Sequence, residues 1–176
     1  MKKTIIPTNK EVFFDEHDII VSKTDVKGRI TYANKTFCDV AGYTEAEVLN
    51  QPHSIVRHPD MPRAVFKLLW DTILAGREIF AYVKNMTKTG DFYWVLAHAT
   101  PSYDKSGTVV GFHSNRRVPD RTVVQDVIVP LYTAIANEER QHKNGQKALA
   151  AGTEYVVNFL KSENVSYDEL IFSLCK

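Results

Sequence analysis

Residues 19–34 read IIVSKTDVKGRITYAN, and this stretch has the pattern of a β-hairpin. The segments Ile19 to Thr24 and Arg29 to Ala33 are rich in β-branched and aromatic residues, which favour strands. Residues 25–28, DVKG, lie between them and supply the residue types of a tight turn. The sequence therefore predicts two antiparallel strands here.

Three further strands are predicted after residue 77. They cover Glu78 to Thr87, Phe92 to Thr100 and Thr108 to Val118, and glycine-containing turns separate them. Period-two alternation in the second of these strands puts Tyr93 on the opposite side from Trp94. One side of this sheet is expected to line a core or a pocket.

Helices are predicted between the hairpin and the later strands. Residues 34–56 contain three short helical pieces, punctuated by Gly42 and Pro52. A longer helix lies between Pro62 and Gly76. Strands on both sides of a helical block favour an α+β fold with a five-stranded antiparallel sheet and short helices on one face.

Both ends of the chain differ from this central part. Thr8 and Glu11 have the spacing of a capping box, which predicts a short N-terminal helix to about Glu16. Apolar residues recur at helical spacing beyond Pro119. We therefore expect an N-terminal helical cap over residues 1–18, a sheet domain over residues 19–118, and a helical tail over residues 119–176.

Composition bounds the classes of function. The 176 residues hold 22 Lys and Arg against 21 Asp and Glu, a net charge of +1, so no bulk charge attracts nucleic acid or anionic lipid. The length excludes a large multidomain enzyme. The sequence contains no apolar run that could insert in a membrane and no secretion signal, which predicts a cytoplasmic location with reduced thiols at Cys38 and Cys175.

Residues 57–62, RHPDMP, are the densest polar cluster in this part of the chain. They precede a predicted helix start, where free N–H groups favour an anion and where Arg57 could add a bidentate phosphate contact. Arg57, His58 and Asp60 could instead pair with one another, with Asp60 capping the helix. Residue types alone leave both interpretations open.

Asn85 lies within a predicted strand. A buried asparagine amide offers a donor and an acceptor together, which suits the edge of a heterocycle such as a flavin, whereas an exposed asparagine on an edge strand needs no ligand. Four histidines, at positions 53, 58, 98 and 113, raise the alternative of haem, although no pair has the i, i+4 spacing typical of a zinc site on a helix. Because hydrolase and phosphate-loop motifs are lacking, we expect no enzymatic turnover and no metal site.

Two halves of a known pattern are present. GRITYAN at 28–34, Phe37 and GYT at 42–44 resemble the first half of a PAS domain, and KTGDFYWV at 88–95 with Pro101 resembles the second. More specifically, QPHSIVRHPDMP at 51–62, followed by Leu69-Trp70 and Val83-Lys84-Asn85, resembles the FAD-binding PAS sensor of aerotaxis receptors and of stand-alone energy-taxis PAS proteins. The resemblance covers about residues 19–118.

The resemblance implies a set of cofactor-binding residues. Arg57, His58 and Asp60 would hold FAD near its phosphates, and Asn85 would contact the isoalloxazine edge. Trp70 and Tyr93 match further positions of the flavin pocket, and Arg116 matches the last-strand position that carries a glutamine in light-sensing relatives.

The input and output of the protein also follow from the resemblance. Light-oxygen-voltage domains carry a cysteine where this chain has His53, so redox state rather than light is the expected input. Aerotaxis receptors continue into a membrane anchor and a signalling rod, whereas this sequence ends at Lys176. The implied function is a redox or oxygen sensor that contacts a membrane-bound chemoreceptor-like partner, its tail serving signal output or homodimerisation. A haem-binding gas sensor and a cofactor-free docking module are the alternatives.

Overall fold

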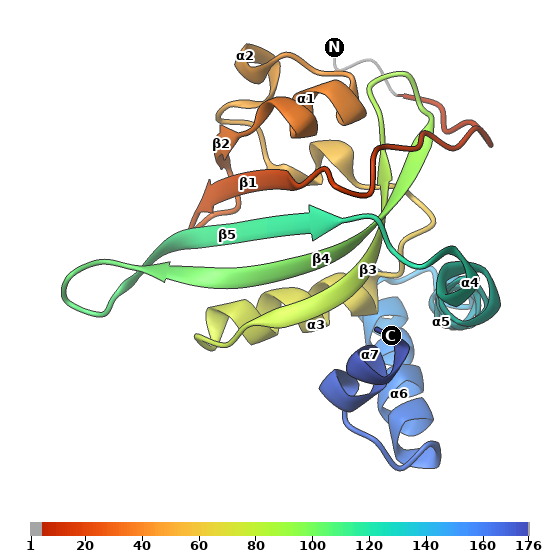
Figure 1. Ribbon diagram of the computed structural model, residues 1–176. Helices are drawn as coiled ribbons and strands as arrows, with labels where there is room; N and C mark the ends of the chain where they lie inside the picture. Colours follow the sequence, from red (N-terminus) through yellow and green to blue (C-terminus); the bar gives the residue numbers. More distant parts are fainter. Residues whose placement is uncertain (1–4, 176) are drawn as a thin grey trace.

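The computed structural model describes residues 5–175 and contains one five-stranded sheet (Figure 1). All pairings are antiparallel and the spatial order is β2-β1-β5-β4-β3, so the hairpin joins the later strands through β1 and β5. The strands are β1 (Ile20–Asp25), β2 (Ile30–Ala33), β3 (Ile79–Met86), β4 (Phe92–Tyr103) and β5 (Val109–Arg117). The predicted five-stranded antiparallel sheet is confirmed.

The inner face of the sheet carries the helices that lie between β2 and β3. They are α1 (Lys35–Ala41), α2 (Glu45–Val48), the short 3-10 helix η1 (His53–Val56) and α3 (Arg63–Leu74). Asn34 caps α1, since its side chain accepts a hydrogen bond from the Phe37 N–H, and Thr44 and Glu47 form a capping box at the start of α2. Local sequence signals therefore determine where these short helices begin.

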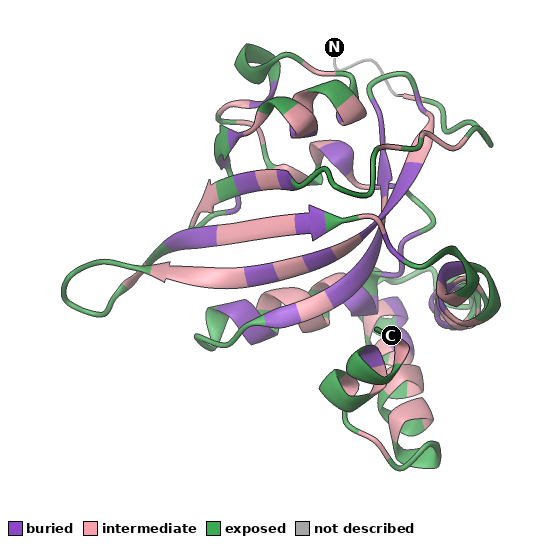
Figure 2. Cartoon of the chain, viewed as in Figure 1, coloured by how far each residue is buried: buried purple, intermediate pink, exposed green. Residues whose placement is uncertain are grey.

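The tail contains the helices that follow β5. They are α4 (Arg121–Val123), a π-helical turn η2 (Val124–Ile128), α5 (Val129–Arg140), α6 (Gly145–Ser162) and α7 (Tyr167–Leu174). The first three run without a break, and the π turn ends two residues before Pro130, a residue with no N–H to donate within a helix. Figure 2 shows buried residues where the tail meets the sheet and more exposed residues toward the α6–α7 connection.

Helix α5 packs on the outer face of the sheet near the edge strand β3. The Tyr132 hydroxyl donates a 2.7 Å hydrogen bond to the Tyr82 carbonyl, and the Tyr132 ring lies 6.2 Å from that of Trp94. Two turns further along, Glu139 contacts α3, which covers the inner face. The helix thus runs past β3 from one side of the sheet to the other.

The prediction of an N-terminal helical cap is wrong for the described residues. Residues 5–19 contain no helix, and the backbone instead pairs with the chain around β4: the N–H of Thr8 donates to Gly90 and that of Val12 donates to Phe92, both at 2.7 Å. Residues 1–4 of the predicted cap lie outside the described residues.

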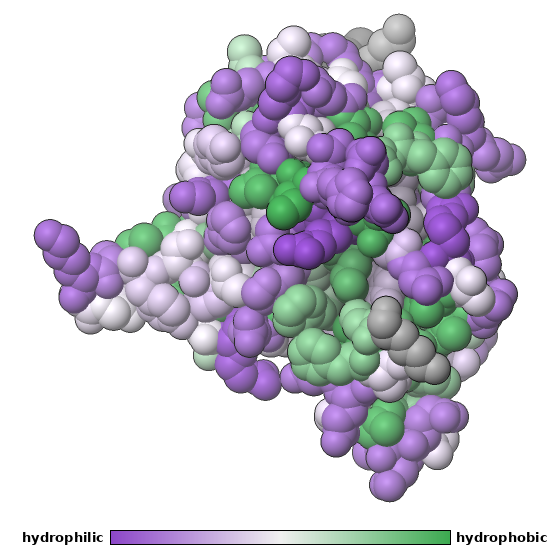
Figure 3. All heavy atoms as spheres, viewed as in Figure 1, coloured by the Kyte–Doolittle hydropathy of each residue, from purple (hydrophilic) through white to green (hydrophobic). Residues whose placement is uncertain are grey.

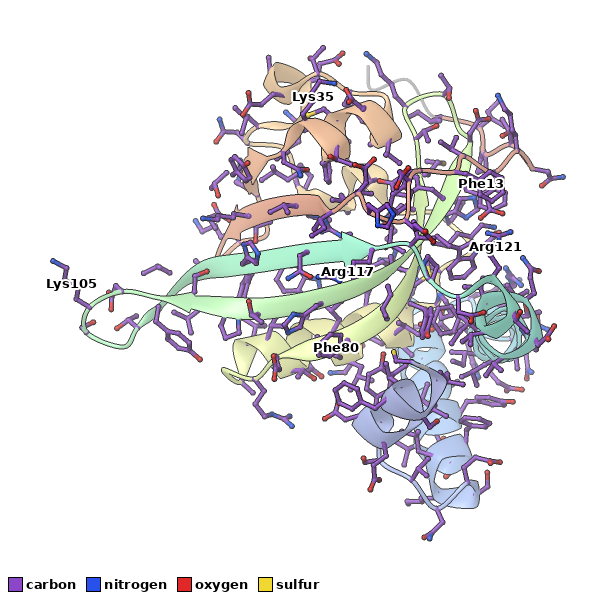
Figure 4. All side chains as sticks on the ribbon, in the orientation of Figure 1. Phe13, Lys35, Phe80, Lys105, Arg117 and Arg121 are labelled. Carbon is purple, nitrogen blue, oxygen red and sulfur yellow. The ribbon has the colours of Figure 1, made fainter. Side chains whose placement is uncertain are left out.

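The physical reason is that both capping side chains have tertiary partners. The Thr8 hydroxyl donates a 2.6 Å hydrogen bond to Asp91, and the Glu11 carboxylate pairs with the guanidinium of Arg121 at the start of the tail. Figure 4 shows Arg121 near Phe13, and its guanidinium lies 5.0 Å from the centre of that ring. The N-terminal segment is therefore held against β4 and the tail.

Candidate cofactor site

A cavity of about 940 Å³ lies between the inner face of the sheet and α3, and the tail closes part of it. This volume is near the upper end of the range for ligand pockets, which is roughly 300–1,000 Å³. Its walls include apolar side chains of the sheet and α3, such as Val83, Ala97, Phe66 and Leu69, together with a small number of polar groups. Such a lining suits a large, mostly apolar ligand with a few polar groups.

Arg116 of β5 lines the cavity and is only 4% exposed. One of its amino groups, Nη2, donates to the Ser22 hydroxyl at 3.0 Å and to Nε2 of His53 at 2.7 Å. The other, Nη1, is buried without a hydrogen-bond partner among the described residues. Burial lowers the pKa of Arg116 to about 10, so the guanidinium is still charged at neutral pH.

His53 holds Arg116 from the side of η1. Burial, with a further contribution from the charge of Arg116, lowers the pKa of His53 to about 3, so the ring is neutral at pH 7. A neutral ring can accept the hydrogen bond at Nε2 while its proton is on Nδ1. The sequence pointed to His53 only as a possible haem ligand and as the position of the cysteine in light-oxygen-voltage domains, so it did not indicate this contact with Arg116.

Asn85 and Trp70 also line the cavity. Asn85 is 4% exposed and lies on β3, where it pairs in register with Tyr93 of β4. Trp70 packs edge-on against Phe112, with ring centres 5.5 Å apart, and a Cβ added at Gly28 would lie 3.0 Å from its ring. Because Asn85 is buried, the simpler interpretation of an exposed asparagine on an edge strand is excluded.

Arg57 lines the cavity at the start of the α3 region. Its guanidinium lies 4.3 Å from the centre of the Phe66 ring, and Nη2 donates to the carbonyl of Met61 at 3.4 Å. Burial lowers the pKa of Arg57, and the neighbouring charge of Arg63 lowers it further. From this position, the Arg57 guanidinium could bind an anionic group of a ligand in the cavity.

His58, Asp60 and Tyr93 do not line this cavity. His58 is buried, and its Nδ1 accepts a hydrogen bond from the N–H of Asp60 at 3.1 Å, while the Asp60 carboxylate binds Lys84 at 2.7 Å. Tyr93 is 1% exposed, and burial raises its pKa. A direct contact of these three residues with a cofactor stays a prediction.

The N-terminus of α3, predicted as an anion site, holds an anion from the chain itself. The carboxylate of Glu139 accepts hydrogen bonds from the N–H groups of Arg63 at 3.0 Å and Ala64 at 2.8 Å. The local-pairing interpretation predicted that Asp60 caps this helix, and that prediction is wrong, because Glu139 accepts the hydrogen bonds instead. No local pattern indicated Glu139, because a charged residue on an amphipathic helix usually faces water.

The buried histidines predict a pH dependence of stability. Burial also lowers the pKa of His58, to about 4, so between pH 6.5 and pH 4 the unfolded chain binds protons that the folded chain does not. The free energy of unfolding should therefore decrease on acidification below about pH 6.5, by up to about 1.4 kcal/mol per pH unit for each histidine.

Urea unfolding between about pH 7 and pH 5 measures this slope. His53→Phe should reduce the slope by up to the contribution of one proton, about 1.4 kcal/mol per pH unit. His17→Gln, at an exposed position, should leave the slope unchanged. Equal slopes for wild type and His53→Phe would show that His53 is not held neutral.

The sheet order, the helices on one face and the cavity beneath them define the fold of PAS sensor domains. Residues 30–116 match the family model described as PAS fold, and these residues form a PAS domain. The domain is of the aerotaxis-receptor type, since the chain is 43% identical to the aerotaxis receptor of Escherichia coli strain K12 over 131 residues.

Other comparisons agree with this family. The nitrogen fixation regulatory protein of Klebsiella pneumoniae is 28% identical over 103 residues, 58% of this chain. The alignment with the aerotaxis receptor covers 74% of this chain. This chain spans only 25% of the length of that receptor and 21% of the length of the Klebsiella protein. The light-state structure of the Aureochrome1 light-oxygen-voltage domain has a TM-score of 0.58 at 17% identity and covers 63% of this chain and 89% of its own, which shows the fold.

The described residues contain neither a membrane-spanning helix nor a group of side chains that could bind a metal ion. Within residues 5–175, no helix combines the length and apolarity needed to cross a bilayer. Among the same residues, no group of three or more His, Cys, Asp or Glu side chains is arranged to hold a metal ion. The family is one of sensor domains rather than typical enzymes.

Proposed function

We propose that this protein is a redox or oxygen sensor that binds FAD in the cavity and signals through contact with a chemoreceptor-like membrane protein. The observation that carries the proposal is Nη1 of Arg116, a buried charged donor that lines the cavity without a partner among the described residues. Leaving such a group unpaired is costly, so its presence favours a ligand that accepts a hydrogen bond there. A flavin ring has acceptors along one edge.

The chain's residues fit such a ring. Asn85 offers a donor and an acceptor from β3, and Arg116 offers a fixed positive charge from β5. Trp70 forms an aromatic wall. The similarity to the aerotaxis receptor and to a light-oxygen-voltage domain studied with a flavin analogue supports the same class of cofactor.

Bound flavin supplies reversible uptake of electrons with a change of charge and protonation. The Arg116 charge lies in a buried environment, where it favours additional negative charge beside it. His53 and Ser22 fix the guanidinium, so a shift in Arg116 must also change their hydrogen bonds. These contacts link the cavity to η1 and β1.

A second connection runs from Asn85 to the tail. Asn85 lies on β3, whose Tyr82 carbonyl accepts the hydrogen bond from Tyr132 of α5. A redox-dependent change at Asn85 that displaces β3 would therefore alter the docking of α5. Such a signal is limited by the difference in interaction free energy between the two cofactor states.

Absorbance of natively purified protein tests the cofactor. We expect flavin bands, and Asn85→Ala should weaken FAD binding about 10- to 100-fold because a buried hydrogen-bonding group is lost. The matched control is Asn158→Ala, at an exposed position of α6. A protein that stays colourless after reconstitution with FAD contradicts the proposal, and a Soret band would select haem instead.

A further inference from the structure

The charged residues that line the cavity are almost all cations. Only one acidic residue, Glu139, is among them, and it is engaged by the N-terminus of α3. The cationic lining residues are Arg57, Arg63, Lys67, Arg116, Arg140 and Lys143. Since the whole chain carries a net charge of only +1, this positive charge is concentrated at the cavity.

Two of these cations belong to the tail. Arg140 ends α5 and Lys143 lies in the connection to α6, and the nearby Gly145 and Leu149 also line the cavity. The cavity therefore extends from Asn85 and Arg116 on the sheet to the α5–α6 connection. Both tail cations are exposed, so they lie where the cavity opens to solvent.

Glu139 fixes this part of the tail against α3. Besides its two hydrogen bonds to the helix start, its side chain packs against Gly152 of α6, where an added Cβ would lie 2.6 Å from Oε1 and 2.7 Å from Cγ. A glycine at this position thus allows α6 to approach Glu139. The helix dipole of α3 offsets the carboxylate charge, which leaves the cations beside it available to a ligand.

We propose that Arg140 and Lys143 bind the phosphate groups of the dinucleotide cofactor, so that the tail forms the outer half of the cofactor site. The inference rests on the proposed function, because it requires the flavin ring to occupy the sheet end of the cavity. Arginine and lysine form strong charge-assisted hydrogen bonds with phosphate oxygens. The tail would thereby select FAD over riboflavin, which has the same ring and no phosphate.

Flavin titrations of the full chain test this assignment. Affinities for FAD, FMN and riboflavin are measured by fluorescence for wild type and for the Arg140→Gln/Lys143→Gln variant. We expect FAD affinity to drop about 10- to 100-fold and riboflavin affinity to change less than about twofold. FMN, with a single phosphate, should be affected less than FAD.

The control removes the same charge elsewhere. Lys105→Gln/Lys161→Gln changes two exposed lysines that do not line the cavity, one of them at the tip of the β4–β5 loop (Figure 4), and should leave all three affinities unchanged. Glu139→Ala should reproduce the selective loss for FAD, since it releases the tail from α3.

The outcomes separate this inference from the proposed function. If wild type binds FAD and the tail variant binds it equally well, the tail assignment is wrong and the proposed function stands. Equal losses for FAD and riboflavin also contradict the assignment, because the effect would not depend on phosphate. If wild type binds no flavin at all, the proposed function itself fails and the tail assignment fails with it.

Discussion

Replacing Arg116 with methionine should stabilise the cofactor-free protein and, at the same time, weaken flavin binding. Arg116 is 4% exposed, and its Nη1 has no partner among the described residues, so burial of the guanidinium carries a desolvation cost that the fold recovers only in part. Methionine fills the same space without a charge. We expect the cofactor-free protein to gain about 1–3 kcal/mol of stability.

Whereas Arg116→Met should stabilise the cofactor-free protein, it should weaken the binding of the cofactor. With the proposed flavin ring beside Arg116, removing this positive charge would disfavour the more negative, reduced cofactor most strongly. A loss of about 1.4–3 kcal/mol in binding the reduced form relative to the oxidised form would lower a two-electron midpoint potential by about 30–65 mV. Flavin titrations and a redox titration of Arg116→Met measure both effects.

Arg117 provides the matched control for Arg116. It is the next residue on β5, exposed, and visible on the outer side of the sheet in Figure 4. Arg117→Met should change neither the stability of the cofactor-free protein nor the midpoint potential by a comparable amount. If Arg116→Met instead destabilises the cofactor-free protein, the hydrogen bonds to Ser22 and His53 are net stabilising and the residue is structural.

Gly111→Ala should destabilise the protein by about 3 kcal/mol, through a contact between backbone segments. Gly111 pairs with Asp25 across β5 and β1, and an added Cβ would lie 2.2 Å from the carbonyl oxygen of Thr24. A backbone carbonyl in a sheet cannot rotate away, so the two strands must separate. This pairing joins the β1–β2 hairpin to the rest of the sheet.

The same substitution should also disturb the cavity. Ser22 on β1 accepts a hydrogen bond from Arg116 on β5, so separation of the strands releases the guanidinium. Urea unfolding measures the stability, and flavin titration measures the effect on the site. We expect both to be impaired.

Gly107→Ala is the control, since Gly107 has a φ of 82° but nothing within 4 Å of the added Cβ. It should cost only about 1–2 kcal/mol, from backbone strain. Equal costs for the two variants would show that close approach at Gly111 is not the cause.

In Figure 3 hydrophobic residues gather in the middle of the visible face among hydrophilic ones, and the projecting end of the tail is mostly hydrophilic. Positive charge at the cavity therefore arises from arrangement rather than from composition, because the net charge is only +1.

The sequence by itself determined the five strands, the short helices and the turns between them. Alternation in β4, the Asn34 cap of α1 and the Thr44 capping box of α2 depend on residues a few positions apart, so local patterns are sufficient to predict them. Motif resemblance also pointed to Arg57, Trp70, Asn85 and Arg116, all of which line one cavity.

Only the tertiary structure decided how the two ends of the chain are used. Thr8 and Glu11 have the local pattern of a helix start, yet their side chains bind Asp91 and Arg121, which lie 83 and 110 residues away. Glu139 likewise caps a helix 75 residues before it and brings the tail to the cavity. Long-range hydrogen bonds and ion pairs of this kind depend on the packing of the whole chain, so no pattern within one segment predicts them.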